Sequence, residues 1–298
     1  MKHALCSTIE RVVRSRLLAS GLASALSLCA SAHAQDAADT LRARHDTLAD
    51  KLADNAFKRP LYLESVQGSD NQRGDVYAEV RYPLAIIEQS MQGASQWCDI
   101  LILHLNVKRC QAETLPARNT LSVSIGKKFD ESASDANRVD FTYRLAAMQP
   151  LYFQVLLNAP MGPLGTRDYR IALEAVPLDA DRSFLHMSYS YDYGMAARLA
   201  MQAYLATVGA GKVGFSVVDR GANGRPILVS GVRGVVERNT MRYYLGIEAY
   251  LGALASPAAE RAFKRINDWF AATEEFPAQL HELSASEYVQ MKRREIQP

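Results

Sequence analysis

The sequence predicts an α+β fold, in which a curved antiparallel sheet packs around one long C-terminal helix and further helices lie at both ends. From residue 121 onward, segments of alternating apolar and polar residues follow one another with turn-forming residues between them, as antiparallel strands do. Residues 240–254 have apolar side chains around most of a helical circumference, which indicates a helix buried on nearly all sides. Strands in runs with a helix packed on one face are typical of α+β domains.

The first 34 residues have the three parts of a secretory signal. A segment with four Lys or Arg residues precedes an uncharged stretch at 17–34, which is rich in Leu, Ala and Ser and ends in Ala32-His33-Ala34. Ser and Gly dilute this stretch too much for a membrane span, which needs about 20 predominantly apolar residues. An uncut anchor helix and a lipid-modified Cys29 are the alternatives. We predict cleavage after Ala34, a location in a bacterial periplasm and no integral membrane span in the mature chain.

The charge balance argues against one class of partner. The chain has 298 residues, of which 34 are basic and 32 acidic. Removal of the signal takes away four basic residues and one acidic residue, which leaves 264 residues with 30 basic and 31 acidic ones. A nearly neutral chain has no strong net field to attract a nucleic acid, so we expect no nucleic-acid partner. We divide the chain into a signal (1–34), an N-terminal helix (35–59) and a folded domain with a helical C-terminal extension (60–298).

Cys98 and Cys110 are the two cysteines left after cleavage, and in an oxidising compartment they are expected to form one disulfide. Bridged Cα atoms lie about 4.4–6.8 Å apart, whereas twelve residues of straight helix span about 18 Å. The chain must therefore reverse direction between them, and residues 97–108 are predicted to form a helical turn and a return segment. Zinc is the competing use of a cysteine pair. Because the sequence offers no further ligands at short spacing, we predict no metal and no cofactor.

The N-terminal half begins with a predicted amphipathic helix at 38–57, where leucines recur at helical spacing. Segments 61–67 and 75–82 alternate and are joined by turn-forming residues, which predicts a β-hairpin. Pro83 then begins a helix at 84–92, because proline is favoured at the first helical position.

The C-terminal half continues with five expected strands, at 121–129, 138–145, 151–157, 169–176 and 183–193. A helix is predicted at 195–208, and segments 212–218 and 227–235 are predicted to form a second hairpin. The tail is expected to be helical. It contains the buried helix at 240–254, and Ser284 with Glu287 predicts a capping box at the start of the last helix.

Three segments give the chain a resemblance to a known superfamily. They are the unit Gly74–Pro83 that leads into a helix, the Trp97-Cys98 segment after it, and the run 237–244 that enters the last buried helix. In element order, residues 60–280 resemble the START-like superfamily, also called SRPBCC, with its helix-grip fold. The resemblance implies a cavity under the C-terminal helix that binds lipids, sterols or other hydrophobic ligands, and some members are cyclases or hydrolases. The signal, the disulfide and the extra terminal helices are unusual for that group and leave the specific ligand open.

Two groups of candidate ligand-binding residues follow from local patterns. Gly246, Ala249 and Ala253 form a stripe of small side chains, which either leaves room for a ligand or lets the helix pack closely on the sheet. Tyr189 and Tyr191 alternate with polar residues on one strand. Their rings and hydroxyl groups either contact a ligand or form an aromatic ladder on the sheet.

The remaining candidates are charged or aromatic. Arg238 and Arg242 are four residues apart on one side of a helix, where they either bind an anionic lipid headgroup or pair with nearby acids such as Glu237. We add Trp97 and Tyr243, which lie in the segments that carry the START-like resemblance. His104 and His186 are candidate bases, but a histidine among apolar residues is more often a hydrogen-bonded core residue. Because no nucleophile elbow or phosphate loop is present, we assign no catalytic residue.

These patterns lead to three hypotheses about function. We expect a periplasmic carrier or sensor that binds a hydrophobic small molecule or lipid in an internal cavity, with peripheral membrane contact as an additional option. The first alternative is an enzyme of the same fold, of the cyclase or hydrolase type. No catalytic motif supports this hypothesis. The second is an interaction protein that docks an envelope partner through its extra helices.

Overall fold

An eight-stranded antiparallel sheet is the main element of the computed structural model, which describes residues 34–115, 118–207 and 209–296. The predicted signal peptide, apart from Ala34, lies outside the described residues. The strand order is β1-β2-β8-β7-β6-β5-β4-β3. The strands are β1 (Leu61–Gln67), β2 (Asn71–Val80), β3 (Val107–Leu115), β4 (Arg118–Ile125), β5 (Asn137–Gln149), β6 (Tyr152–Met161), β7 (Thr166–Pro177) and β8 (Ser183–Tyr193).

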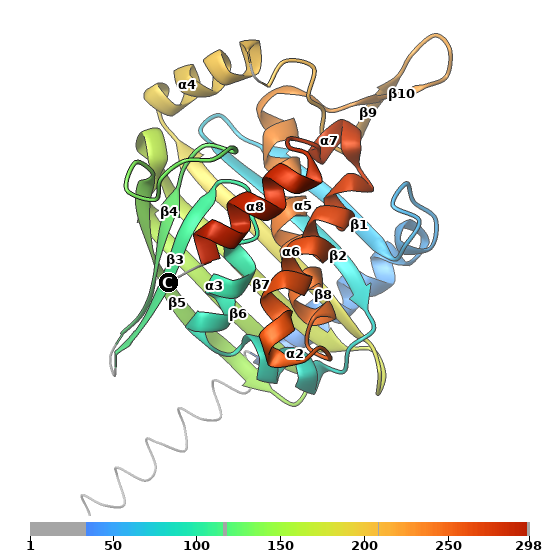
Figure 1. Cartoon of the computed structure of the whole chain (residues 1–298). Coiled ribbons are helices and arrows are strands. Elements are labelled where there is room, and N and C mark those ends of the chain that lie inside the picture. The colour runs from blue at the N-terminus through green and yellow to red at the C-terminus, as the bar shows by residue number, and fades with distance from the viewer. Residues whose placement is uncertain (1–33, 116–117, 208, 297–298) are drawn as a thin grey trace, which may run out of the picture.

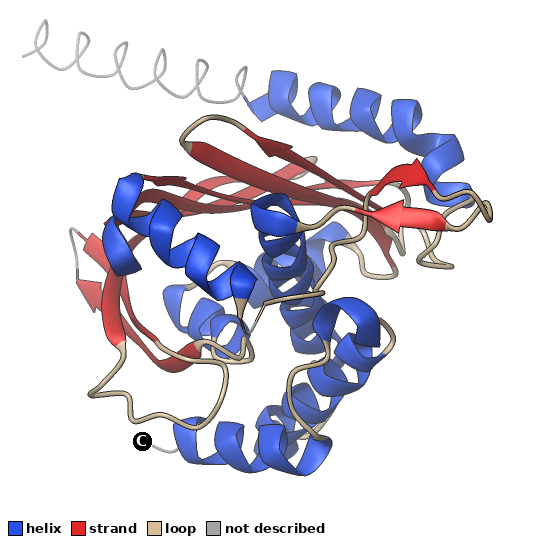
Figure 2. Ribbon diagram, turned by 90° about the horizontal axis from the view of Figure 1, so that it is seen from above, coloured by secondary structure: helices blue, strands red, loops and turns tan. Residues whose placement is uncertain are grey.

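Helices cover both faces of this curved sheet, as Figures 1 and 2 show. The N-terminal helix, described over residues 34–53, lies alone on the outer face. Helix α5 packs along the inner face, where it contacts β1, β2 and β8. The helices on the inner side are α2 (Leu84–Met91), α3 (Ala94–Leu101), α4 (Met195–Ala206), α5 (Gly231–Gly252), α6 (Ala258–Glu274), α7 (Pro277–Leu280) and α8 (Ala285–Ile296). The predicted α+β fold, a curved antiparallel sheet that grips a long C-terminal helix, is confirmed.

The alternation of β8 explains how one strand serves two hydrophobic cores. Leu185, Met187 and Tyr189 belong to the inner core between the sheet and the helices. Phe184 belongs to the outer core, where it packs with Leu48 of the N-terminal helix. Because successive side chains of a strand point to opposite faces, every buried residue on this strand has a fixed side.

The N-terminal helix ends several residues before the predicted boundary at residue 57. It ends at residue 53, because the side-chain amide of Asn55 donates hydrogen bonds to the carbonyl oxygens of Lys51 at 2.9 Å and Leu52 at 3.0 Å. These bonds satisfy carbonyl groups that the last turn of a helix leaves free. Within the described residues, no helix has the length and hydropathy that a membrane crossing requires.

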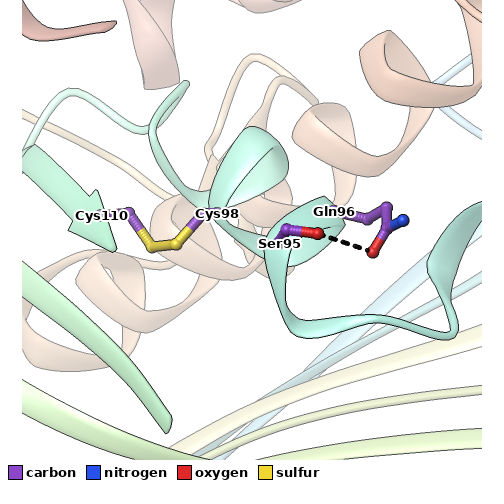
Figure 3. Close-up of a disulfide and its surroundings, with 4 residues drawn as sticks. All are labelled: Ser95, Gln96, Cys98 and Cys110. Carbon is purple, nitrogen blue, oxygen red and sulfur yellow. Dashed lines mark hydrogen bonds between the residues drawn. A yellow bond between two sulfur atoms is a disulfide. The ribbon is translucent and has the colours of Figure 1, made fainter. Parts of the chain in front are cut away.

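The predicted disulfide is present and joins α3 to the edge of the sheet (Figure 3). The Cα atoms of Cys98 and Cys110 lie 5.2 Å apart. Between them α3 ends at Leu101, and the chain reverses before β3 begins at Val107. The predicted helical turn and return segment at 97–108 are therefore confirmed.

The second hairpin is shorter than predicted, and the long helix is longer. Strands β9 (Val217–Arg220) and β10 (Pro226–Leu228) pair around the expected turn, but the predicted strand at 227–235 is wrong beyond Leu228. Residues from Gly231 onward are helical and form the first turns of α5. β-branched residues such as Val235 and Val236 suggested a strand, but packing of this segment on the sheet, with Val236 in the core between them, outweighs the local preference.

Candidate ligand-binding cavity

A cavity of about 990 Å³ lies between the inner face of the sheet, helix α4 and the first half of α5. Residues of β2, β7 and β8 form one wall, and Ala197, Met201 and Tyr204 of α4 cover it. The segment after β4 and the segment between α7 and α8 close one end. Its walls therefore come from parts of the chain that are far apart in sequence.

Tyrosine side chains form the apolar wall of the cavity. Tyr169 of β7 stacks on Tyr191 of β8 with ring centroids 5.2 Å apart, and Tyr189 and Tyr193 continue the wall along β8. Burial raises the pKa of Tyr189 and Tyr191, so their hydroxyl groups stay neutral. The predicted residues Tyr189 and Tyr191 thus lie in the cavity wall and at the same time form the aromatic ladder that was the alternative.

Gln72 on β2 is a polar group of this wall that the sequence did not single out. It lies opposite Tyr191 in the strand register and is 1% exposed. Neither its amide nitrogen nor its amide oxygen has a hydrogen-bond partner among the described residues. An unsatisfied buried amide costs about 1–3 kcal/mol, so a polar group that reached this side chain from the cavity would stabilise the protein. Gln72 lies on the same face of β2 as Val76 and Ala78, and this alternation is the sequence pattern that could have identified it.

A charged group closes the opposite end of the cavity. Lys128 donates to the hydroxyl group of Tyr204 at 2.8 Å and to the carboxylate of Glu282 at 2.5 Å. Burial and the charge of Arg242 lower the pKa of Lys128. Burial alone would raise the pKa of Tyr204 and Glu282, but interactions with Lys128, and with Arg242 for Glu282, outweigh it and lower both. Sequence patterns could not find this group, because its members come from three distant segments.

Arg238 and Arg242 lie beside this charged group without lining the cavity. Arg242 donates to Glu282 at 2.9 Å, and Arg238 donates to the carbonyl oxygen of Val213 at 3.2 Å. Glu237 instead accepts hydrogen bonds from Ser65 and from the backbone of the 215–216 segment. Arg242 therefore pairs with an acid, as the alternative expected, but that acid is Glu282, and neither arginine pairs with Glu237.

The buried His104 and the partly buried Tyr243 form a stack behind the tyrosine wall. Their ring centroids lie 4.7 Å apart, and Tyr243 also contacts Tyr189 at 5.2 Å. Burial and the charges of Arg242 and Lys292 hold the pKa of His104 well below its usual value, so the ring is neutral. Neither residue lines the cavity, which corrects their assignment as direct ligand contacts.

Trp97 and Gly246 also lie away from the cavity, because they pack α3 against its neighbours. Trp97 donates from its indole nitrogen to the carbonyl oxygen of Met91 at 3.0 Å. A Cβ atom added at Gly246 would lie 3.3 Å from the carbonyl oxygen of Ile100 and 3.9 Å from Trp269. The stripe that begins at Gly246 therefore serves close helix packing and leaves no room for a ligand there.

His186 belongs to the outer face of the sheet, under the N-terminal helix. Its two ring nitrogens lie 2.8 Å from Asp75 and 2.7 Å from Glu174. Burial alone would lower the pKa of His186, but the two carboxylates outweigh it and raise the pKa. The described residues contain no group of three or more His, Cys, Asp or Glu side chains that could hold a metal ion.

Comparison with known proteins gives matches among solved structures alone. No protein-family model and no curated protein matches the chain. Norcoclaurine synthase from Thalictrum flavum is 13% identical, with 50% of this chain and 80% of that chain covered and a TM-score of 0.33. Human StAR-related lipid transfer protein 5 is 8% identical, with 59% and 90% covered and a TM-score of 0.31. Zhui aromatase/cyclase from Streptomyces sp. R1128 is 10% identical, with 72% and 95% covered and a TM-score of 0.28.

The architecture of the chain itself identifies its fold. A β-hairpin leads into two short helices, a run of antiparallel strands completes the curved sheet, and a 22-residue helix packs into it. This is the element order of the START-like, helix-grip fold.

Proposed function

We propose that the protein binds a hydrophobic small molecule or a lipid in the cavity beneath α4, as a carrier or sensor. The cavity of about 990 Å³ is the observation that supports this proposal. Most of the wall surface is apolar, and polar groups such as Gln72 and Lys128 lie among the aromatic and aliphatic side chains. Small-molecule sites in proteins combine this size range with apolar walls and a few convergent polar groups.

A pair of neighbouring alanines on α4 allows a matched test. Ala197 lines the cavity, whereas Ala196 is exposed. Native mass spectrometry of the mature protein is expected to show a co-purifying apolar ligand, which Ala197→Trp displaces and Ala196→Trp retains. An empty cavity together with a co-purifying protein would instead support an envelope interaction protein.

We also propose that binding takes place in the periplasm. The basic, apolar and Ala-His-Ala segments at the N-terminus support export, and disulfides such as Cys98–Cys110 persist in oxidising compartments. Fractionation of cells followed by N-terminal sequencing tests this proposal. We expect the periplasmic protein to begin at Gln35, and a protein that begins at Met1 in the cytoplasmic fraction would contradict export.

The outer face of α4 supports peripheral membrane contact during ligand exchange. Met195 and Leu199 are 69% and 59% exposed on the helix that covers the cavity. Such a helix can insert apolar side chains into the boundary between headgroups and acyl chains. Leu199→Glu is expected to slow ligand transfer to lipid vesicles without reducing the amount of ligand bound. Unchanged transfer would exclude this face as the contact.

The group formed by Lys128, Tyr204 and Glu282 favours an enzyme as the second candidate. A lysine and a tyrosine with lowered pKa values, in hydrogen-bond contact within a cavity, are suited to proton transfer. Incubation of the protein with its extracted ligand, followed by mass analysis, separates the two candidates. An enzyme converts the ligand and loses this conversion in Tyr204→Phe while still binding, whereas a carrier leaves the ligand unchanged.

A further inference from the structure

Three cationic side chains surround a single carboxylate at the charged end of the cavity, and a fourth cation lies nearby. Glu282 lies 2.5 Å from Lys128, 2.9 Å from Arg242 and 3.8 Å from Lys212. Arg238 is the fourth cation, one helical turn before Arg242 on α5. Burial lowers the pKa of Arg242, and the nearby charge of Arg238 lowers it further. We refer to these four cations and Glu282 as the Glu282 cluster.

The Glu282 cluster has more positive charge than its own carboxylate can balance. Arg238 is 1% exposed, and among the described residues no carboxylate oxygen lies within 4.0 Å of its guanidinium group. Its Nε and Nη2 atoms have no hydrogen-bond partner within the described chain, and neither does Nε of Arg242. A buried charge without a partner is strongly destabilising, so an additional anion at this position would stabilise the protein.

The cavity offers such an anion a place. Lys128, Tyr204 and Glu282 line it, and Glu282 is the one carboxylate among the described lining residues. The tyrosine wall supplies apolar surface beyond this charged end. Apart from Lys127 beside Lys128 and Arg198 over the ring of Tyr193, the rest of the described lining is uncharged. Hydrogen bonds to charged groups are about twice as strong as neutral ones, so an anion is expected to favour the end at Lys128.

We infer that the ligand is an amphipathic molecule whose carboxylate or phosphate group binds at the Glu282 cluster and whose apolar part lies along the tyrosine wall. This inference rests on the proposed function, because it names the chemical class of the ligand in the same cavity. The oxyanion accepts hydrogen bonds from Lys128 and Tyr204. Arg238 and Arg242 stabilise it through their charge without lining the cavity.

A series of ligands with one chain and different head groups tests this inference on the delipidated mature protein. We use hexadecanoate, hexadecyl phosphate, hexadecanol and hexadecyltrimethylammonium, and we measure Kd by displacement of a fluorescent apolar probe. At least one anion is expected to bind about tenfold more tightly than the alcohol, and the cation to bind most weakly. The comparison of hexadecanoate with hexadecyl phosphate shows which oxyanion the cluster prefers.

Variants show whether the Glu282 cluster causes the preference. Lys128→Met and Arg238→Met are expected to bring the anion and the alcohol to within about threefold of one another, while alcohol binding is kept. Arg238→Met is also expected to raise the Tm of the ligand-free protein, because it removes a buried charge without a partner. Lys264→Met on α6, which removes a partly exposed lysine that does not line the cavity, is the matched control and should keep the preference.

The outcomes separate this inference from the proposed function. If none of the four amphiphiles displaces the probe and the probe itself does not bind, the proposed function fails and this inference fails with it. If the alcohol or the cation binds as tightly as the anions, the apolar cavity stands and the inference about the oxyanion is overturned. Retention of the preference in both Lys128→Met and Arg238→Met would also overturn it.

Discussion

The two halves of helix α5 are both mostly buried but face different surroundings. In the first half, Val232, Val235 and Asn239 line the cavity. In the second half, Leu245 and Ala249 pack tightly against Ile266 and Trp269 of α6. A helix that is buried on nearly all sides thus faces open space along one part of its length and protein along the other.

The covering helices explain the difference. Helix α6 places large side chains against α5, and both Ile266 and Trp269 are at most 2% exposed. Helix α4 places the small Ala197 and the flexible Met201 over the cavity, with Tyr204 near its C-terminal end, and Ala197 is its one buried residue in the described chain. Side-chain volume on the second helix therefore decides whether the space beside α5 is filled. Burial of α5 alone carries no information about a cavity.

Loss of the largest side chain at the packed half tests this comparison most strongly. Trp269→Ala is expected to lower the free energy of unfolding by about 3–5 kcal/mol, because it leaves a void and removes a hydrogen bond. The indole nitrogen donates to the carbonyl oxygen of Arg242 at 3.0 Å. Urea denaturation measures the change. Leu199→Ala on α4 is the control and should stay within about 0.5 kcal/mol, since Leu199 is 59% exposed. Equal losses in both variants would break the distinction.

A second prediction separates stability from ligand uptake. Gly246→Leu is expected to lower the free energy of unfolding by about 1–3 kcal/mol, because the new side chain meets Ile100 and Trp269. Ligand binding by the folded fraction should be unchanged. Ala197→Trp should show the reverse, with loss of ligand and little loss of stability. Loss of binding in Gly246→Leu at full stability would show that the packed half also contacts the ligand.

The pH dependence of stability tests the surroundings of α5 between its two halves, where His104 stacks on Tyr243. Its folded-state pKa lies below the unfolded value of about 6.5, so below that pH the unfolded chain binds a proton that the folded one does not. The free energy of unfolding should therefore fall by up to about 1.4 kcal/mol per pH unit as the pH is lowered from 6.5 to 5.5. His104→Gln should make the free energy of unfolding less dependent on pH, which urea denaturation at several pH values measures.

His186 serves as an internal control of opposite sign for this measurement. Its folded-state pKa is raised, so its contribution is fully present below about pH 6.5 and is lost as the pH rises through the raised value. His186→Gln should therefore destabilise the protein most at the acidic end. A His104→Gln variant with an unchanged slope would show that the ring is protonated in the folded state.

The smallest expected effect concerns the cavity wall. Gln72→Leu should raise the free energy of unfolding of the ligand-free protein by about 1 kcal/mol, because it removes two unsatisfied buried groups. It should also weaken ligand binding, which calorimetry measures. Gln111→Leu replaces an exposed glutamine on β3 and should change neither quantity. A loss of stability in Gln72→Leu would show that the amide has a structural partner.

Much of the fold could be predicted from local patterns. Alternation located strands such as β8, and the capping box at Ser284 and Glu287 begins α8 with hydrogen bonds in both directions. The disulfide spacing required the reversal between α3 and β3. The start of α5 was missed, because valines favour strands locally and helical packing overrides that preference.

Sequence patterns could predict only those residues of the candidate site that lie together on one strand. Tyr189 and Tyr191 share a face of β8 and lie in the wall together. Gly246 and Trp97 were misplaced, because small and aromatic side chains serve close packing as well as binding. Lys128 was not found, since no periodicity marks a single lysine after a strand.

The sequence by itself determined the strand alternation, the covalent link between Cys98 and Cys110 and the burial of the last long helix, because each depends on residues that are neighbours along the chain. Tertiary structure alone decided which half of α5 faces a cavity. It also brought Lys128, Tyr204 and Glu282 together around one point. Both outcomes depend on how far apart packed elements stand and which side chains fill the gap, and these distances are set by contacts between segments that are remote in sequence.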